Sequence, residues 1–254
     1  MRKIGFSALL AVIFSLGISV KADANEIFWG FSQNITSASD VSTLGTSVLA
    51  LNASGFSDAP VVVNSVTFQT LDVFDANGLA NFSTTFNSGR NDSIAFGFGG
   101  LTGGVADLVQ GGFFGGGTPT PTDITHTFSG LTVGGTYEIQ LFINDSRTAD
   151  GRSSDWINGL SDGNGNLNVA TLNLNNGPAG PTTGDFITGT FTADTTTQSF
   201  TTQSSTDGGV TFSATGSANQ INALQLRLLA VPEPTSGALL FGGLLCGLVR
   251  RRRK

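Results

Sequence analysis

The chain has 254 residues, of which 12% are charged and 39% are hydrophobic, with 20 Phe, one His and one Cys. One Cys excludes a disulfide scaffold and a Cys-rich zinc site, one His excludes a multi-histidine metal centre, and the abundant Phe excludes an acidic disordered chain. Residues 25–231 hold four basic and 16 acidic residues, a formal charge of −12. Because such a body repels a phosphate backbone, we expect no nucleic-acid binding.

Residues 1–24 have the pattern of a secretory signal peptide. Arg2 and Lys3 precede an apolar run from Ile4 to Ile18, and Ala22-Asp23-Ala24 offers small residues at the expected cleavage positions. Cleavage after Ala24 would leave a mature chain that begins at Asn25. The alternative is a retained membrane anchor, against which the short run and the small residues argue.

Residues 25–230 have the pattern of short β-strands separated by Gly-, Thr- and Asn-rich turns. About ten short strands in a region of this length predict an all-β fold with a single β-sandwich or jelly roll and long Gly/Thr-rich loops. One or two helical turns are expected over Val105–Gln110. The clearest predicted strands are Val61–Val63 with Thr67 and Phe68, Ile124–Phe128, Tyr137–Ile143, Val169–Leu174, Phe186–Ala193, Gln198–Thr202, Val210–Ala214 and Ile221–Leu229.

Two of these strands alternate clearly between two faces. Over residues 137–143, Glu138 and Gln140 fall on the face opposite to the aliphatic residues. Over residues 221–229, three Leu share one face, with Gln225 and Arg227 on the other. A period of two of this kind predicts strands that pack one face on a core.

A series of segments in the body resembles uncharacterised secreted bacterial domains related to galactose-binding or malectin-like jelly rolls. The matching segments are residues 40–46, 50–52, 63–68, 128–137, 141–147, 161–165, 189–194 and 222–227. The resemblance implies a jelly-roll fold and favours contact with glycans. It attaches no catalytic residues to the chain.

The residues for enzymatic chemistry are few. His126 lies in a predicted strand, where a solvent-facing position is expected rather than the role of a catalytic base, and Cys246 lies in the C-terminal apolar run. Glycoside hydrolysis by paired carboxylates is the alternative, since the body is rich in acids. Only Glu26 and Glu138 in the body are Glu, and neither lies in an evident cleft motif. We therefore expect no enzymatic activity.

The segment 144–156 is the strongest candidate for ligand binding. It follows a predicted strand and is expected to form a long loop at one end of the sandwich, where many sandwiches bind ligands. Trp156 could stack on a sugar ring, and Asp145, Arg147 and Arg152 could bind its hydroxyl groups. The alternative is structural, with Asp145 pairing Arg147 and Trp156 capping the core.

A neighbouring segment offers oxygen ligands that suit calcium. Asp162, Asn164 and Asn166 occupy alternate positions, and Asp155 could assist them. The segment lacks the glycine and the acidic residue that an EF-hand has at its sixth and twelfth positions, so any site would be irregular. No cofactor is otherwise expected for this chain, so calcium is its one candidate cofactor, and a solvated turn is the alternative.

Three features follow one another at the C-terminus. The first is Val231-Pro232-Glu233-Pro234, which is extended and continues neither a helix nor a strand. An apolar run follows over residues 235–249, shorter than the roughly 20 residues of a full membrane span. The last is a basic cluster that would stay cytoplasmic, formed by Arg250, Arg251, Arg252, Arg253 and Lys254.

This tail over residues 231–254 resembles the PEP-CTERM sorting signal of Gram-negative bacteria, which is also catalogued as an ice-binding-protein C-terminal segment. The resemblance implies a short hydrophobic transmembrane helix, transient inner-membrane anchoring, and recognition by an exosortase-type membrane transpeptidase. It does not imply ice binding, and it leaves the body undefined. A plain tail anchor is the alternative.

The sequence thus predicts three parts: a signal peptide (1–24), a β-sandwich ectodomain (25–230) and a sorting signal (231–254). We expect an exported protein of the cell envelope or the extracellular polysaccharide matrix, membrane-anchored before processing. The ectodomain is expected to have a structural or glycan-binding role. An extracellular polysaccharide hydrolase and a tail-anchored structural protein are the alternatives.

Overall fold

The computed structural model describes residues 26–53, 60–70, 79–86, 88–91, 101–115, 123–145, 157–174, 183–212 and 219–231. Strands dominate these ranges, which also contain a short helix, α1 (Gly104–Leu108), and a 3-10 turn, η3 (Ala38–Asp40). The predicted all-β fold is confirmed, and α1 lies where helical turns were expected.

The largest sheet has eight strands in the order β1-β13-β10-β16-β3-β5-β4, with β2 also paired to β13. Its neighbouring strands are antiparallel except for β3 and β5, which run parallel. Register shifts at the start of β10, between Thr136 and Tyr137, and in the middle of β16, between Leu226 and Arg227, mark β-bulges. The eight strands are β1 (Phe28–Trp29), β2 (Gln33–Asn34), β3 (Thr46–Asn52), β4 (Val61–Val63), β5 (Val66–Thr70), β10 (Thr136–Ile143), β13 (Asp185–Thr192) and β16 (Ala223–Ala230).

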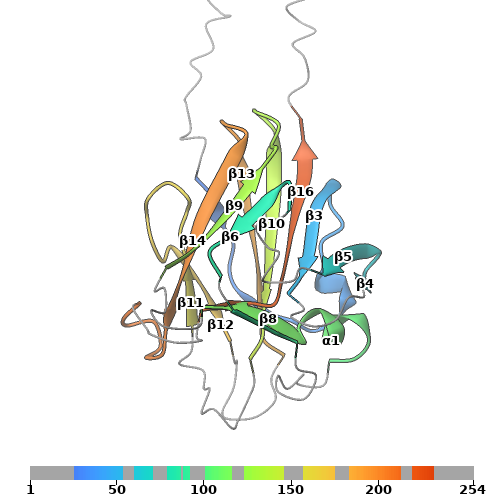
Figure 1. The fold of residues 1–254 in the computed structure, drawn as a ribbon, viewed down its shortest axis with the longest axis vertical. Helices are drawn as coiled ribbons and strands as arrows, with labels where there is room; N and C mark the ends of the chain where they lie inside the picture. Colours follow the sequence, from blue (N-terminus) through green and yellow to red (C-terminus); the bar gives the residue numbers. More distant parts are fainter. Residues whose placement is uncertain are drawn as a thin grey trace, which may run out of the picture.

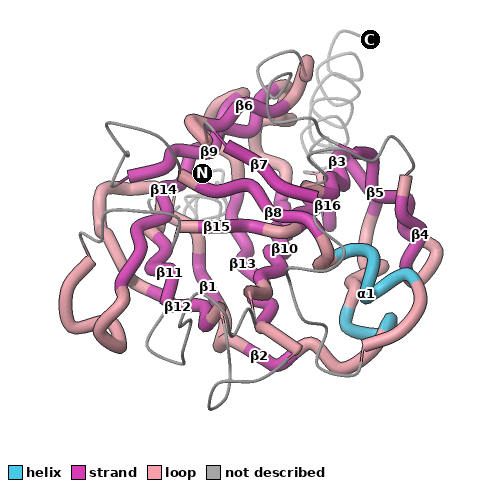
Figure 2. The backbone as a smooth tube through the Cα atoms, turned by 60° about the horizontal axis from the view of Figure 1, so that its bottom comes forward, coloured by secondary structure: helices cyan, strands magenta, loops and turns pink. Residues whose placement is uncertain are grey.

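Two smaller sheets complete the fold. Figure 1 shows β14, β9 and β6 in front of β13, β10 and β16, and Figure 2 shows β15, β8 and β7 lying across one end of the molecule. The five-stranded sheet has the order β12 (Ala170–Asn173), β11 (Ile157–Leu160), β14 (Thr197–Ser205), β9 (Asp123–Ser129) and β6 (Phe82–Thr84). The three-stranded sheet has the order β15 (Gln220–Ile221), β8 (Gly111–Phe114) and β7 (Ser88–Asn91).

The main hydrophobic core lies between the eight-stranded and the five-stranded sheets. Alternate residues of each strand face it, such as Ile139 and Leu141 of β10 and Phe128 of β9, and all three are fully buried. Burying one such side chain contributes about 1.5–3 kcal/mol. Phe128 also stacks on Phe200 of β14 with ring centroids 6.1 Å apart, so the five-stranded sheet presents a continuous aromatic surface to the core.

A second core covers part of the other face of the eight-stranded sheet. It joins Phe142 of β10 and Phe186 of β13 to Ile35, to the β4–β5 hairpin and to Val105 of α1. Phe142 and Phe68 meet edge to face at a centroid distance of 6.3 Å. The hairpin, α1 and the segment before β3 therefore form a third layer at this edge of the sandwich.

The same layer buries the polar face of β10 and β16. Gln140 donates to the Asp40 carbonyl (2.6 Å) and accepts from the Ser42 N–H (3.0 Å) and the Gln225 amide (2.7 Å). The Arg227 guanidinium donates to the carbonyls of residues 43, 44 and 45. The predicted alternation of β10 and β16 is therefore correct, but residues 40–45 cover the polar face. The hydrogen bonds to these residues replace those that the polar side chains would make to water.

The two ends of the sandwich differ in their connections. At one end, the short β9–β10 and β13–β14 turns bond to each other, from the Ala193 N–H to the Gly135 carbonyl (2.9 Å) and from the Gly134 N–H to the Ala193 carbonyl (2.6 Å). We call this end the turn pole and define it as residues 43–46, 130–136, 192–197 and 229–231. It is the upper end in Figure 1, where the β16 arrow ends.

One predicted strand is wrong in its described part. Residues 210–212 of the expected strand Val210–Ala214 form no strand, because the Asp207 carboxylate holds them in a turn. Its Oδ1 accepts from the N–H groups of Val210 (3.1 Å) and Thr211 (2.9 Å), and its Oδ2 accepts from the Thr211 hydroxyl (2.5 Å). Residues 213 and 214 lie outside the described ranges.

The two predicted terminal segments are not part of the structural description. Residues 1–25 and 232–254 lie outside the described ranges, and with them the expected signal peptide and short C-terminal helix. In the part of the chain that the structure describes, no helix is long and apolar enough to cross a membrane.

Candidate functional site

The predicted sorting signal begins where the ectodomain ends. β16 finishes at Ala230, and Val231, the last described residue, is 53% exposed. β16 pairs with β10 on one side and β3 on the other, so the tail leaves from the interior of the sheet. Pro232, Glu233, Pro234 and the four predicted arginines lie outside the described ranges.

The predicted glycan-binding loop is described only at its first residues. Asp145 follows β10 and is fully buried, and its N–H donates to the Leu174 carbonyl (2.8 Å). The buried Asp145 carboxylate is not accessible to a ligand in solvent, so it does not fit the predicted contact with sugar hydroxyls. Arg147, Arg152 and Trp156 lie outside the described ranges, and their binding role stays a prediction.

The predicted calcium segment forms a self-contained turn around Asp162. Its Oδ1 accepts from the N–H groups of Asn164 (2.8 Å) and Asn166 (3.0 Å), and its Oδ2 accepts from the Asn166 amide (2.5 Å). Burial acts to raise the pKa of Asp162, but these hydrogen bonds favour the charged form, and the pKa lies below its usual value. The turn thus satisfies the carboxylate without an ion.

The remaining ligands of the calcium hypothesis are not assembled in the described residues. Asp155 lies outside the described ranges. The part of the chain that the structure describes contains no group of three or more His, Cys, Asp or Glu that could hold a metal ion. Calcium binding stays a prediction that the observed turn does not require.

The expectation that His126 faces solvent is wrong. His126 shares the inner face of β9 with Ile124 and Phe128, and it is completely buried. Its ring packs against the rings of Phe86 and Phe200 at centroid distances of 5.0 and 4.7 Å. Burial lowers the pKa of His126 to about 3, so the ring is neutral near pH 7.

The hydrogen bonds of His126 fix its tautomer. The Thr202 hydroxyl donates to the Asn219 side-chain oxygen (2.7 Å), so it accepts from His126 Nε2 (3.3 Å). Nδ1 then accepts from the Thr84 hydroxyl (3.1 Å). Both ring nitrogens are used inside the core, where a substrate has no access, and His126 is a structural residue.

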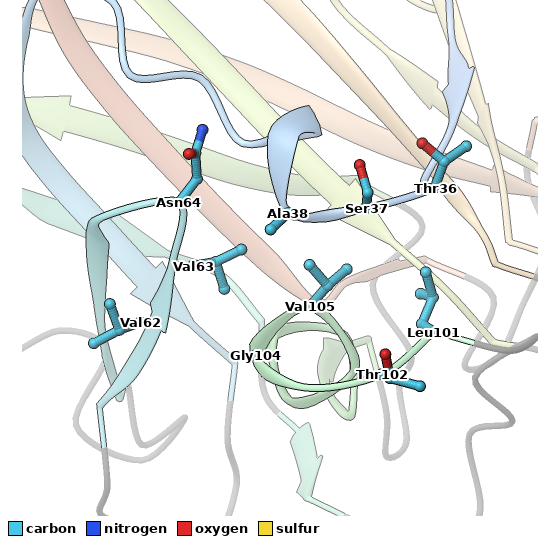
Figure 3. A pocket seen from close by; sticks show the side chains of 10 residues that line it. All are labelled: Thr36, Ser37, Ala38, Val62, Val63, Asn64, Leu101, Thr102, Gly104 and Val105. Carbon is cyan, nitrogen blue, oxygen red and sulfur yellow. The ribbon is translucent and has the colours of Figure 1, made fainter.

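A surface cleft that the sequence did not indicate lies beside α1. Its volume is about 350 Å³, at the low end of the range for small-molecule sites. Figure 3 shows Val63 and Val105 pointing into the space between the β4–β5 hairpin and α1, with Thr36, Ser37 and Asn64 along one side. The lining residues are Thr36, Ser37, Ala38, Val62, Val63, Asn64, Leu101, Thr102, Gly104 and Val105.

Local hydrogen bonds hold the wall of this cleft in place. The Asp40 carboxylate accepts from the N–H groups of Thr36 (2.6 Å) and Ser37 (2.8 Å) and from the Thr36 hydroxyl (2.9 Å). The Asn64 amide donates to the Val41 carbonyl (2.8 Å), which ties the hairpin to the same segment. Positive φ angles at Asn64 (47°) and the next residue (65°) give the two-residue turn that presents this amide at the rim.

The chemistry of the cleft is neutral. None of its ten lining residues is ionisable. The Ser37 and Thr102 hydroxyls and the Asn64 amide can donate and accept hydrogen bonds, and the Thr36 hydroxyl, which donates to Asp40, can accept. Val63 and Val105 form an apolar, buried floor. This combination suits a neutral ligand with hydroxyl groups and apolar C–H faces, and none of the lining residues offers a charged partner to a metal ion or a phosphate.

The comparison with known families concerns the tail. Residues 230–254 match the PEP-CTERM protein-sorting motif. The match starts at the last residue of β16 and includes all eight predicted sorting residues. No curated protein and no solved structure matches the chain. The likeness of the body to galactose-binding or malectin-like domains, and the link to ice-binding proteins, therefore stay unsupported predictions.

The motif indicates how the chain is sorted. Proteins with a PEP-CTERM motif are recognised by an exosortase, which is a membrane protein. The chain is therefore sorted by an exosortase-type system, with export and membrane-anchored sorting before processing. The motif covers only the last 25 residues, so the role of the sandwich must be argued from its own residues.

Little in the sequence indicates the cleft. Its lining comes from residues 36–38, 62–64 and 101–105, which are brought together only by the tertiary fold. The one local signal is Asn64-Ser65 between two valine-containing strands, a pair typical of a tight hairpin turn. Two further amphipathic aromatics of the body have structural partners, because the Trp29 indole donates to the Ser161 carbonyl (2.8 Å) and Tyr137 is buried against Phe191.

Proposed function

We propose that this chain is an exported protein of the cell envelope or polysaccharide matrix whose ectodomain binds neutral glycans in the cleft beside α1. The observation that carries the proposal is the absence of any ionisable group among the cleft-lining residues, combined with hydroxyl and amide groups around an apolar floor. Sugars present the same combination, with polar hydroxyl rims and apolar C–H faces. The sorting motif supports an extracytoplasmic setting in which polysaccharide is a natural ligand class.

The charge of the body favours a neutral glycan over an acidic one. Residues 25–231 have a formal charge of −12, and a protein field of this sign repels anionic polysaccharides. Because none of the lining residues of the cleft is basic, the cleft offers no compensating attraction for carboxylates or sulfates. Neutral hexose polymers are therefore the proposed ligands, which the cleft binds without cleaving them.

We further propose that the ectodomain is not an enzyme. A glycosidase needs a general acid with a raised pKa, whereas the pKa values of Asp162 and Asp207 are lowered by their hydrogen bonds. Asp145 and Asp185 are buried, and Asp185 accepts from Asn173 of the five-stranded sheet. His126 is enclosed in the core. These carboxylates and the histidine support the structure rather than a reaction.

A binding experiment with matched variants tests the proposal. Thr102→Trp fills the cleft from its exposed rim, and Thr67→Trp places the same side chain at an exposed position of β5 outside the cleft. The full chain is titrated with neutral polysaccharides such as dextran, mannan and galactan, with alginate as the acidic comparator. We expect binding to a neutral polymer, a loss of at least about tenfold in affinity for Thr102→Trp, and an unchanged affinity for Thr67→Trp.

Four outcomes would contradict the proposal. Equal affinities for the two Trp variants would place the site elsewhere, and loss of binding with Arg152→Ala or Trp156→Ala alone would assign it to the loop at residues 144–156. No binding to any polymer would leave a structural role without a glycan ligand. Release of reducing sugars by the wild type, abolished by a single Asp→Asn change, would instead identify a hydrolase.

A further inference from the structure

The turn pole differs from the rest of this acidic body in its charge. Of the residues that define it, only Asp194 is ionisable. Three of its residues expose large apolar side chains, with exposed fractions of 62% for Leu44, 55% for Val133 and 53% for Val231. Its other exposed residues include several threonines, such as Thr132 and Thr195. This end of the sandwich is therefore nearly neutral and partly apolar.

The exposed apolar residues surround the point at which the tail leaves. β16 pairs through Leu228 with Thr46 of β3 and through Ala230 with Thr136 of β10. A Cβ atom on Gly45 would lie 2.3 Å from the Leu228 carbonyl oxygen, and one on Gly135 would lie 3.2 Å from a Leu228 methyl carbon. The chain segments that carry Leu44 and Val133 thus lie on opposite sides of the end of β16.

The length of the tail brings this pole close to the membrane. Only residues 232–234 separate Val231 from the apolar run 235–249. Four residue steps span at most about 14 Å, while the headgroup layer is itself about 5–7 Å thick. A helix of 15 residues would span about 22 Å, less than the roughly 30 Å apolar thickness of a bilayer. Such a shortfall draws flanking residues toward the interface.

We propose that the turn pole rests on the lipid bilayer while the sorting tail is still attached, with Leu44, Val133 and Val231 at the level of the headgroups. The lipid surface is the favoured occupant because the short tail keeps the pole within reach of the membrane, and because the pole carries a single acidic residue, Asp194, for anionic lipids to repel. The opposite end of the sandwich and the cleft beside α1 then stay available to the extracytoplasmic space. Processing of the tail releases this contact.

A pair of fluorescent labels on the full chain tests this proposal. Cys246→Ser removes the natural thiol, and an environment-sensitive label is then attached after either Val133→Cys, at the turn pole, or Val210→Cys, which is 81% exposed beyond the other end of β14. The protein is reconstituted in vesicles of phosphatidylethanolamine and phosphatidylglycerol that contain headgroup-proximal spin-labelled lipids. We expect several-fold stronger quenching and a blue-shifted emission for the label at position 133.

A charge substitution adds a second readout. Leu44→Asp places a charge on the pole at an exposed position, and Leu167→Asp is the matched control at a residue that is 50% exposed. Leu44→Asp should reduce the quenching at position 133, and Leu167→Asp should leave it unchanged. Equal quenching at positions 133 and 210, or none at either, would overturn the proposal. A response at position 133 that requires added exosortase would assign the pole to a protein contact and also overturn it.

Discussion

The single histidine of the chain makes the stability of the ectodomain depend on pH in a narrow window. In the folded protein burial lowers the pKa of His126 from 6.5 to about 3, so the ring stays neutral, whereas in the unfolded chain it gains a proton below pH 6.5. The stabilising contribution is therefore complete above pH 6.5 and is lost progressively as the pH falls toward 3. The Phe86 and Phe200 rings provide no counter-charge that would offset this loss.

The expected size of the effect follows from the shift. Each pH unit within the window corresponds to about 1.4 kcal/mol, which gives a loss of about 2 kcal/mol between pH 7 and pH 5. For a domain of this size the loss lowers Tm by about 4–8 °C. The pKa values of Asp162 and Asp207 are lowered from 3.8, so the stability that they contribute is lost only as the pH falls through about 4 and below. It therefore does not change between pH 7 and pH 5.

Urea unfolding of the wild type and of His126→Gln at pH 7, 6 and 5 measures the effect. Gln is neutral at every pH and keeps an amide that can face Thr84 and Thr202, so its variant should be less stable at pH 7 but nearly insensitive to pH across this range. The difference between the two proteins should shrink by about 2 kcal/mol from pH 7 to pH 5. Parallel pH profiles for both proteins would refute the buried, neutral state of the ring.

Three further predictions concern other parts of the fold. Gly45→Ala should lower the free energy of unfolding by at least about 2 kcal/mol more than Gly103→Ala. Both glycines have a φ near +62°, but only at Gly45 would a Cβ atom clash with the Leu228 backbone. Equal losses in urea titrations would contradict the packing at β16. Arg227→Met should cost about 3 kcal/mol. Arg227→Lys should recover little of it, since a single ammonium nitrogen cannot occupy the positions of both Nε and Nη2, which donate to the three carbonyls; full recovery by Lys would contradict this geometry. Asp162→Asn should lower Tm equally with calcium or with chelator, and a calcium-dependent rise in Tm confined to the wild type would restore the calcium hypothesis.

The arrangement of strands could be predicted to the extent that it depends on local alternation. Residues 137–141 and 224–228 alternate strictly, and the structure has β10 and β16 there with the expected inner faces. The central strand β3 was not predicted as a strand, because its sequence Thr-Ser-Val-Leu-Ala-Leu-Asn alternates only weakly. Its position is set by pairing with β16 and β5, which are distant in sequence.

Burial of polar residues could not be predicted by the same means. Gln140 and Arg227 look like solvent-facing residues because alternation cannot show that residues 40–45 cover their face. The polar side chain of His126 predicts a solvent-facing position, whereas the alternation places it on the same inner face as Ile124 and Phe128, where the structure has it. The cleft depends on three segments that only the tertiary fold brings together, whereas the sorting tail is contiguous and could be recognised from sequence alone.

The most direct test of the sorting and processing of this chain is the intact mass of the protein recovered from the envelope of cells with and without an active exosortase. We predict that the active system yields a protein that ends near Pro232–Pro234 and lacks Arg250 to Lys254, with the β-sandwich intact up to Ala230. Cells without the enzyme should retain the complete tail. Recovery of protein that still ends at Lys254 when the exosortase is active would contradict the account.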